Sequence, residues 1–259
     1  VRDEDEAGLD CGGSSCGACS GSVCVRGIDC AGSICGAGGR CVDQPIITGV
    51  SPADGRPGTF VTISGLNFGT STGQVMFGGR PASAPEACVV LASSTLWNPF
   101  QAIVSVPEGA TTSSISLLNR NSSLSDTTAD DRGPRIPDFR VNNIARPGLC
   151  GSRPNAATLG ERGRVDFLGI NLGARSDRVM FDDREFNSFL EWNNSNIGMS
   201  TPIISSGRYS VTARVAGIDS NSVGFTLYDR VLTEAPVIDG IDPGSAAVGE
   251  MVTIVGRRF

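Results

Sequence analysis

The sequence contains no lysine and no histidine, and all 21 of its basic residues are arginine. Without imidazole the chain cannot form a Ser-His-Asp triad, a Cys-His pair or a histidine metal site. These absences exclude the commonest hydrolase and metalloenzyme mechanisms. Aromatic residues are also few, at 6%, whereas the 34 glycines and 14 prolines indicate many turns and short strands.

Long hydrophobic runs are absent as well. No segment approaches the roughly 20 apolar residues that a membrane helix requires, and the start of the chain has neither the basic nor the apolar part of a signal peptide. We expect no membrane span in this segment, and we expect any secretion signal to precede Val1.

The charge of the chain argues against nucleic acid as a partner. Phosphate neutralisation needs cations gathered on one face. The 27 acidic residues give a net charge of −6, and the arginines are scattered apart from Arg257 and Arg258.

Cysteines crowd the start of the chain, where residues 1–43 hold seven of the nine, spaced C-x4-C-x2-C-x4-C-x5-C-x4-C-x5-C. This segment has too few large apolar residues for a core, so disulfides or zinc must hold it. Disulfides are favoured because there is a single C-x2-C pair and no histidine. The disulfide candidates are Cys11, Cys16, Cys19, Cys24, Cys30, Cys35, Cys41, Cys88 and Cys150. Cys88 and Cys150 form either a bridge between later domains or two free buried thiols.

Other candidate sites are weaker. Asn121 and Asn193 begin N-glycosylation sequons. Asp3, Asp5 and Asp10 could offer hard oxygen ligands to a structural calcium ion, although a solvated acidic stretch is the favoured interpretation. No other cofactor is expected.

A 24-residue segment recurs without gaps, because residues 45–68 and 236–259 agree at ten positions with a constant offset of 191. A middle copy aligns residues 61–80 with residues 165–184, including the triplet Val-Met-Phe and the pattern G-x-N-x-G. Such self-similarity is typical of repeated domains.

Each copy has the pattern of strands and turns. Alternating apolar residues at 60–64 predict a strand with one buried face. The Gly and Asn of the following segment favour a turn with positive φ, and QVMF (74–77) predicts the next strand. Residues 102–109 with 113–118, and 209–215 with 222–228, are interpreted as two antiparallel hairpins. Six or seven strands per 90 to 100 residues indicate β-sandwiches.

The pattern PxIxGxxPxxGxxGxxVTIxGxNFG, followed by VxF and VPxG, resembles the IPT/TIG family of immunoglobulin-like domains. The second copy departs where Cys150 replaces the usual Ser-Pro turn. VRDEDEAGLDCGG (1–13) resembles the start of a DCGG-type Cys-rich module of very large bacterial and algal surface proteins. In that family a further cysteine precedes the acidic run, so we expect the module to begin before Val1.

The fold class expected is therefore all-β, with tandem immunoglobulin-like sandwiches after a small disulfide-rich module. Short proline-containing linkers favour a semi-rigid extended rod. The predicted units are a Cys-rich module at 1–43, sandwiches at 44–133 and 134–234, and the first strands of a third sandwich at 235–259.

The residues must decide function, because the IPT/TIG family includes transcription factors, plexin-like receptors, accessory modules of polysaccharide-active enzymes and repetitive surface proteins. Carboxylate pairs such as Asp182 and Asp183 fall in predicted turns, so an enzyme is not expected. Trp97 and Trp192 could stack on sugars, although packing is favoured.

We expect a structural segment of a giant extracellular protein, such as the shaft of a cell-surface filament like the algal mastigoneme, with copies of itself or other filament subunits as partners. The alternative is an adhesin or receptor ectodomain that recognises glycan or protein ligands.

Overall fold

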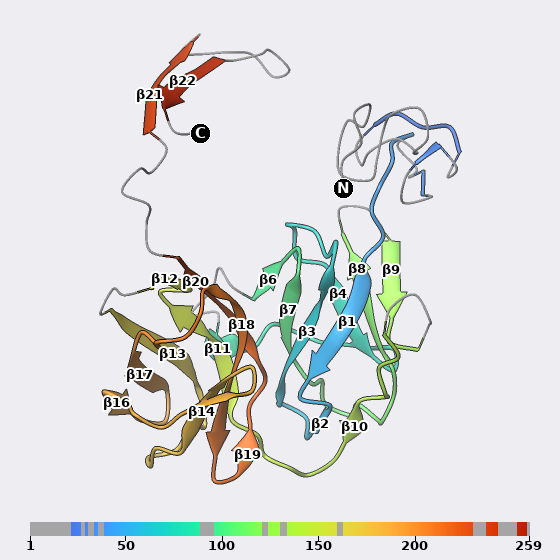
Figure 1. Cartoon of the computed structure of the whole chain (residues 1–259). Helices are drawn as coiled ribbons and strands as arrows, with labels where there is room; N and C mark the ends of the chain where they lie inside the picture. Colours follow the sequence, from blue (N-terminus) through green and yellow to red (C-terminus); the bar gives the residue numbers. More distant parts are fainter. Residues whose placement is uncertain are drawn as a thin grey trace.

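The computed structural model describes residues 22–26, 29–30, 34–35, 39–88, 96–120, 124–129, 134–159, 163–229, 237–242 and 253–257. Their regular structure is almost entirely β-strand, and their α-helical residues are confined to one turn at 86–88. The all-β prediction is confirmed. Figure 1 shows two sandwiches, a Cys-rich head above the first one and a separate hairpin near the C-terminus.

In the first sandwich two four-stranded sheets face each other. Valine, isoleucine and phenylalanine from alternate positions of the strands fill the space between them, as expected for strands with one face in a core. One sheet has the order β1 (Ile46–Ser51), β3 (Phe60–Leu66), β7 (Gln101–Ser105), β6 (Trp97–Asn98), and the other β5 (Arg80–Pro81), β4 (Gln74–Phe77), β8 (Ile115–Asn119), β9 (Leu124–Thr127).

The second sandwich contains both strand orders and adds β12 (Ala156–Thr158) and β19 (Ile218–Asp219) to its second sheet. Its core gathers the rings of Phe167, Phe181 and Phe225, whose centroids lie 5.8 to 6.1 Å apart. One sheet is β11 (Gly148–Arg153), β13 (Arg164–Ile170), β17 (Asn196–Ser200), β16 (Glu191–Trp192). The other is β12 (Ala156–Thr158), β20 (Val223–Tyr228), β18 (Gly207–Val215), β14 (Arg178–Phe181), β15 (Arg184–Phe186), with β19 (Ile218–Asp219) beside β18.

The repeated segment forms the same irregular hairpin three times. β1 pairs with β3 through a register shift between Ile47 and Gly49, and β11 pairs with β13 through one between Leu149 and Gly151. In the third copy β21 (Val237–Asp242) pairs with β22 (Thr253–Arg257) through a shift between Ile238 and Gly240. A bulge of this kind bends the strand at one defined position. Ile254, which corresponds to the buried Ile63, is 50% exposed.

Two expectations about the chain path were wrong. β7 and β8 do not form a hairpin, because they lie in different sheets and the chain between them crosses the sandwich with Val106 and Ala110 buried. β18 and β20 do pair as predicted. The second copy also keeps its proline turn, since a cis peptide precedes Pro154 just as one precedes Pro52.

The segment between the sandwiches is attached to the first one. Phe139 is buried against Phe77, with the ring centroids 5.2 Å apart. β10 (Arg140–Val141) pairs in parallel with β2 (Asp54–Gly55). The predicted boundary after residue 133 therefore precedes residues that pack on the first core.

In the described part of the head, disulfides join Cys24 to Cys35 and Cys30 to Cys41, with Cα atoms 5.8 and 5.4 Å apart. Three of these sulfurs lie within 4.8 Å of one another. Because both pairs are oxidised, these four residues offer no thiolate to zinc. Cys11, Cys16 and Cys19 lie outside the described residues.

Asn67 and its counterpart Asn171 occupy the left-handed region, with φ of 60° and 56°. The Asn67 side chain donates to the carbonyl oxygen of Gln44 at 3.0 Å. Asn and Gly tolerate this conformation, whereas other residues pay roughly 1–2 kcal/mol. We predict that Asn67→Ala lowers the free energy of unfolding by about 2 kcal/mol and that Asn67→Gly lowers it less, measured by chemical denaturation with Thr70→Ala as control. Equal effects of the two Asn67 variants would contradict this explanation.

Candidate functional site

The two sandwiches lie side by side along a common seam (Figure 1), not end to end as the rod prediction implied. A disulfide joins Cys88, on the helical turn of the first sandwich, to Cys150 on β11 of the second, with Cα atoms 5.2 Å apart. Both residues are fully buried. The two cysteines are 62 residues apart in the sequence. Closing a loop of this length stabilises a fold by about 4 kcal/mol in the chain-entropy account.

The outer face of β3 forms the first sandwich's side of the seam. Val61 and Ile63 point into the first core, while Phe60, which alternates with them, belongs to the buried cluster of the second sandwich. A methyl group added to Gly148 would lie 2.4 Å from the Phe60 ring. A glycine is therefore needed where β11 approaches this ring.

Asn221 is the polar centre of the seam. It is 0% exposed, and its side-chain oxygen accepts a hydrogen bond from the backbone nitrogen of Leu149 at 2.7 Å. Its amide nitrogen donates to the Leu149 carbonyl oxygen and to the Thr62 hydroxyl, both at 2.9 Å. The Thr62 hydroxyl then donates to the Ser222 carbonyl oxygen at 2.5 Å. Buried polar side chains are almost always hydrogen-bonded, and these contacts satisfy both the oxygen and the nitrogen of the Asn221 amide.

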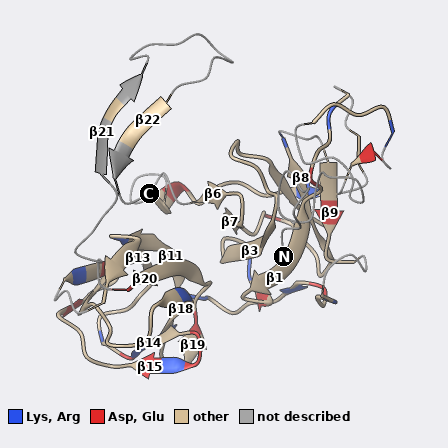
Figure 2. Cartoon of the chain, turned by 45° about the horizontal axis from the view of Figure 1, so that its top comes forward, with Lys and Arg blue, Asp and Glu red and all other residues tan. Residues whose placement is uncertain are grey.

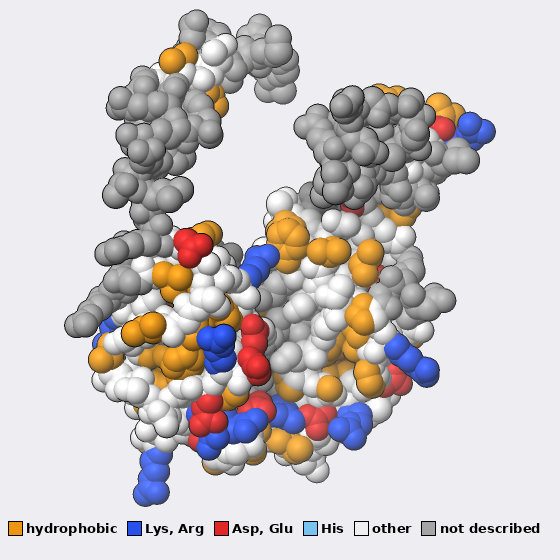
Figure 3. All heavy atoms as spheres, in the orientation of Figure 1, with side chains coloured by type: hydrophobic (Ala, Val, Ile, Leu, Met, Phe, Trp, Pro, Cys, Tyr) orange, Lys and Arg blue, Asp and Glu red, His pale blue; other side chains and the backbone are white. Residues whose placement is uncertain are grey.

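An ion-pair network closes one end of the seam. The Arg146 guanidinium pairs with the Asp54 carboxylate of the first sandwich, and each side chain is 15% exposed. The same guanidinium donates to the Asp219 carbonyl oxygen of the second sandwich at 3.0 Å. Figure 2 shows charged segments around β18 and β19, and Figure 3 shows acidic and basic side chains next to one another along the lower edge of both sandwiches.

Asp219 is the acid that this network perturbs most clearly. Arg214 donates two hydrogen bonds to its carboxylate, at 2.6 and 2.8 Å, and these hold the pKa of Asp219 below its usual value against the opposing effect of partial burial. The positive charge of Arg146 lowers this pKa further.

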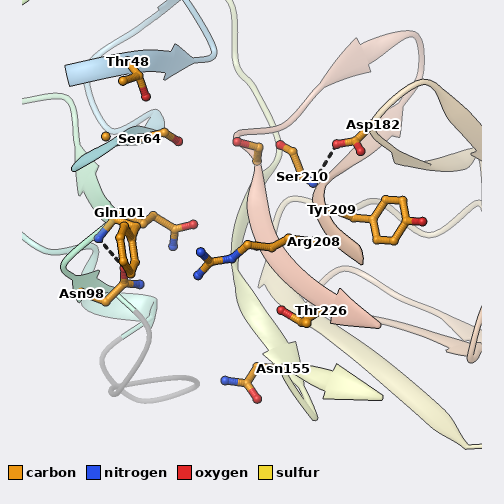
Figure 4. Close-up of a pocket in the computed structure, with 14 residues that line it drawn as sticks. Thr48, Ser64, Asn98, Gln101, Asn155, Asp182, Arg208, Tyr209, Ser210 and Thr226 are labelled. Atoms are coloured by element: carbon orange, nitrogen blue, oxygen red, sulfur yellow. Dashed lines mark hydrogen bonds between the residues drawn. The ribbon is translucent and has the colours of Figure 1, made fainter. Parts of the chain in front are cut away.

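A polar cleft opens at another part of the seam, with a volume of about 550 Å³. We call it the interdomain cleft. Thr48, Ser64, Asn98, Phe100 and Gln101 line it from the first sandwich, and Asn155, Asp182, Arg208, Ser210, Ser222, Gly224 and Thr226 from the second. Figure 4 shows Arg208 extending across it toward Gln101 and Asn98, whereas the Tyr209 ring points away into its own sandwich.

Arg208 and Phe100 meet across the cleft. The Arg208 Cζ atom is 5.1 Å from the centroid of the Phe100 ring, a cation–π contact between the two sandwiches. Phe100 remains 46% exposed. On the other side, the Asp182 carboxylate accepts a hydrogen bond from the Ser210 backbone nitrogen at 2.9 Å.

The residues singled out in the sequence lie mostly away from this cleft. Asn193 is half-buried in the turn between β16 and β17, where its side-chain oxygen accepts hydrogen bonds from Ser195 and Asn196. Asn121 and the calcium candidates Asp3, Asp5 and Asp10 lie outside the described residues. Glycosylation and calcium binding stay predictions.

Both tryptophans pack against the sandwich cores. The Trp97 indole nitrogen donates to the Phe68 carbonyl oxygen at 3.2 Å, and that of Trp192 donates to the corresponding Leu172 oxygen at 2.7 Å. The two half-buried tryptophans therefore hold the equivalent turn, after Asn67 and after Asn171, in the two copies of the repeat.

Sequence reasoning missed Asn221, Arg146 and the interdomain cleft. The signal for the seam was present in β3, where Phe60 lies on the face opposite Val61 and Ile63. A large apolar residue on the second face of a strand indicates that this face is covered too. No local pattern identifies Asn221 as the hydrogen-bond partner of Thr62 on this face, because 159 residues separate the two.

Residues 45–129 match the family model of the IPT/TIG domain, so this part of the chain is an IPT/TIG domain with an immunoglobulin-like fold. No curated protein matches the sequence. Within the described residues no helix has the length and apolar character needed to cross a membrane. The disulfides are consistent with an oxidising, extracellular setting.

Several solved structures are similar at low identity. The full extracellular region of plexin A4 is 21% identical, with a TM-score of 0.29, and the match covers 77% of this chain and 16% of that one. A Bacteroides ovatus SGBP-B from a mixed-linkage glucan utilization locus, in complex with a heptasaccharide, is 15% identical with a TM-score of 0.29. That match covers 76% of this chain and 47% of the SGBP-B chain. The gamma-CGTase of an alkalophilic Bacillus clarkii is 12% identical with a TM-score of 0.30, and the match covers 65% of this chain and 23% of the CGTase chain. The chain thus spans less than half of each of these proteins, and similarity at this level carries no conclusion about function.

We predict that Asn221→Ala lowers the free energy of unfolding by about 3 kcal/mol or more, because it leaves the buried N–H and C=O groups of Leu149 without their partner. Denaturant titration would measure the loss, with the exposed Asn143→Ala as the matched control. A loss no larger than that of the control would show that the seam does not depend on this amide.

We predict that the Arg214–Asp219 pair makes stability depend on pH in the acid range. Because the folded pKa of Asp219 is lowered, its contribution is present above the unfolded value of about 4 and is lost as the pH falls through the folded value. The carboxylate is 41% exposed, so we expect Asp219→Asn to cost only about 0.5–1 kcal/mol at neutral pH. Unfolding curves at pH 7 and below pH 3 would measure this difference, which should shrink on acidification. A difference that grows on acidification would contradict the assignment.

Proposed function

We propose that this chain is a non-catalytic structural segment of a large repetitive extracellular protein, forming the shaft or coat of a cell-surface filament such as a flagellar mastigoneme. The observation that carries the proposal is the seam. The sandwiches are joined by a buried disulfide, a shared apolar cluster and the buried Asn221 network. An interface of this kind suppresses the relative motion that is the default for neighbouring domains.

The repetition of the unit supports the same proposal. The second sandwich contains both strand orders of the IPT/TIG domain, with β12 and β19 added, and β21 with β22 repeats its first bulged hairpin. We take these as a second copy and the beginning of a third, preceded by a Cys-rich module of the DCGG type. Long fibres and stalks are built by repeating such units.

The partners that follow from this role are further copies of the chain or other filament subunits. Tandem sandwiches have exposed faces and sheet edges, which are the kind of surface that subunit assembly buries.

Electron microscopy of the native material tests the proposal. We expect ordered fibres with an axial repeat, with side-by-side sandwich pairs along the shaft. Immunogold labelling with antibodies against residues 44–229 should decorate the fibres at that repeat. Isolated monomers, or labelling confined to the cell interior, would overturn the proposal.

A further inference from the structure

The walls of the interdomain cleft are the outer faces of two sheets. On the second sandwich, Arg208 pairs with Thr226 and Ser210 pairs with Gly224, while the residues between them, Tyr209 and Phe225, point into the core. On the first sandwich, Ser64 pairs with Gln101 in neighbouring strands. Much of each wall therefore stands on paired strands beside the disulfide-linked seam, so the backbone positions of these residues are fixed before any ligand arrives.

The lining is rich in neutral hydrogen-bonding groups. Hydroxyls come from Thr48, Ser64, Ser210 and Thr226, and amides come from Asn98, Gln101 and Asn155. Each hydroxyl and each amide can both donate and accept, and the Asn98 amide keeps its N–H donors for a ligand because its oxygen accepts the Phe100 N–H at 2.9 Å. Such a set suits a ligand that is itself covered with hydroxyl groups, and the volume lies within the roughly 300–1,000 Å³ range of small-molecule sites.

The cleft carries one positive and one negative side chain. Among the described lining residues the charged side chains are Arg208 and Asp182, and one carboxylate oxygen of Asp182 accepts the Ser210 N–H. No described acidic residue forms an ion pair with Arg208, and its guanidinium lies over the face of the Phe100 ring. A guanidinium presents five N–H donors in a planar fork that matches a carboxylate.

We propose that the interdomain cleft binds an acidic oligosaccharide carrying uronic-acid carboxylates. Arg208 donates hydrogen bonds to a uronate carboxylate, and the exposed part of the Phe100 ring packs against the C–H face of the neighbouring sugar. Gln101, Asn98 and Asn155 bond the sugar hydroxyls from both sides of the seam. The inference is independent of the filament role, because a filament and a monomeric ectodomain can both carry this site.

Isothermal titration of the oxidised chain with hexagalacturonate tests the proposal, with cellohexaose as the neutral probe and hexaglutamate as the acidic peptide probe. We expect hexagalacturonate to bind measurably more tightly than either, with an affinity that falls as salt rises. Arg208→Gln should weaken binding at least about 10-fold, because charge-assisted hydrogen bonds are lost. The matched control, Arg175→Gln, removes an exposed arginine of the same sandwich and should leave the affinity unchanged.

A second variant separates binding from any change at the seam caused by losing the Arg208 contact with Phe100. A Cβ atom added at Gly224, which lines the cleft, would have Gln101 Oε1 at 3.7 Å, an ordinary contact, so the first atom of a Gly224→Phe side chain fits there and the variant keeps Arg208. We expect it to abolish hexagalacturonate binding while the melting temperature stays within a few degrees of the parent.

Three outcomes would overturn the proposal. The first is no binding of hexagalacturonate at about 1 mM. The second is equal binding of cellohexaose or hexaglutamate, the latter showing an acidic-peptide site. The third is an equal effect of the Arg208 and Arg175 variants. Fibres seen by microscopy, or their absence, bear on none of these results.

Discussion

The arrangement of the two sandwiches depends on a buried face of one strand. β3 has Val61 and Ile63 on one side and Phe60 and Thr62 on the other, and both sides are buried. Covering the second side requires a partner for the Thr62 hydroxyl, and the fully buried Asn221 amide provides it. The same amide satisfies both backbone groups of Leu149, next to the disulfide at Cys150. Hydrophobic burial, hydrogen bonding and a covalent bond thus meet within a few residues. All three can form together only in one relative orientation of the two sandwiches.

The same strand has another environment in the second copy, which explains why the seam is not simply repeated. Arg164 and Asp166 stand where the first copy has Phe60 and Thr62, and Arg164 pairs with Asp166 and with Glu191 on the solvent side. These side chains are exposed or half-buried, so water covers this face instead of another sandwich. The inner face is kept in both copies because it makes the core. The outer face diverges because it decides what each sandwich touches.

Sequence patterns predict what is local in this fold. The alternation around Val61 and Ile63, the Asn67 turn and the repeat itself follow from periodicity and from the tolerance of Asn for positive φ. The β7 to β8 crossing could not be predicted in that way, because a short proline- and glycine-containing link suits a hairpin equally well. The seam and the cleft depend on residues from distant segments, such as Thr62 with Asn221 and Phe100 with Arg208. No local pattern encodes such pairs, although the large Phe60 on an outer face signals that some cover exists.

The rigidity of the seam bears directly on the chemistry of the cleft. Holding an arginine over an aromatic ring between two domains costs little when the domains are already fixed by a disulfide and a buried amide, because no ordering of the domains remains to oppose the contact. A flexible pair of domains would let the exposed Arg208 side chain turn away from the cleft. In the locked pair it faces a wall of neutral hydroxyls and amides instead. A partner that brings a carboxylate together with hydroxyl groups satisfies both features of that wall at once, and the seam that stiffens the segment thereby also defines the site.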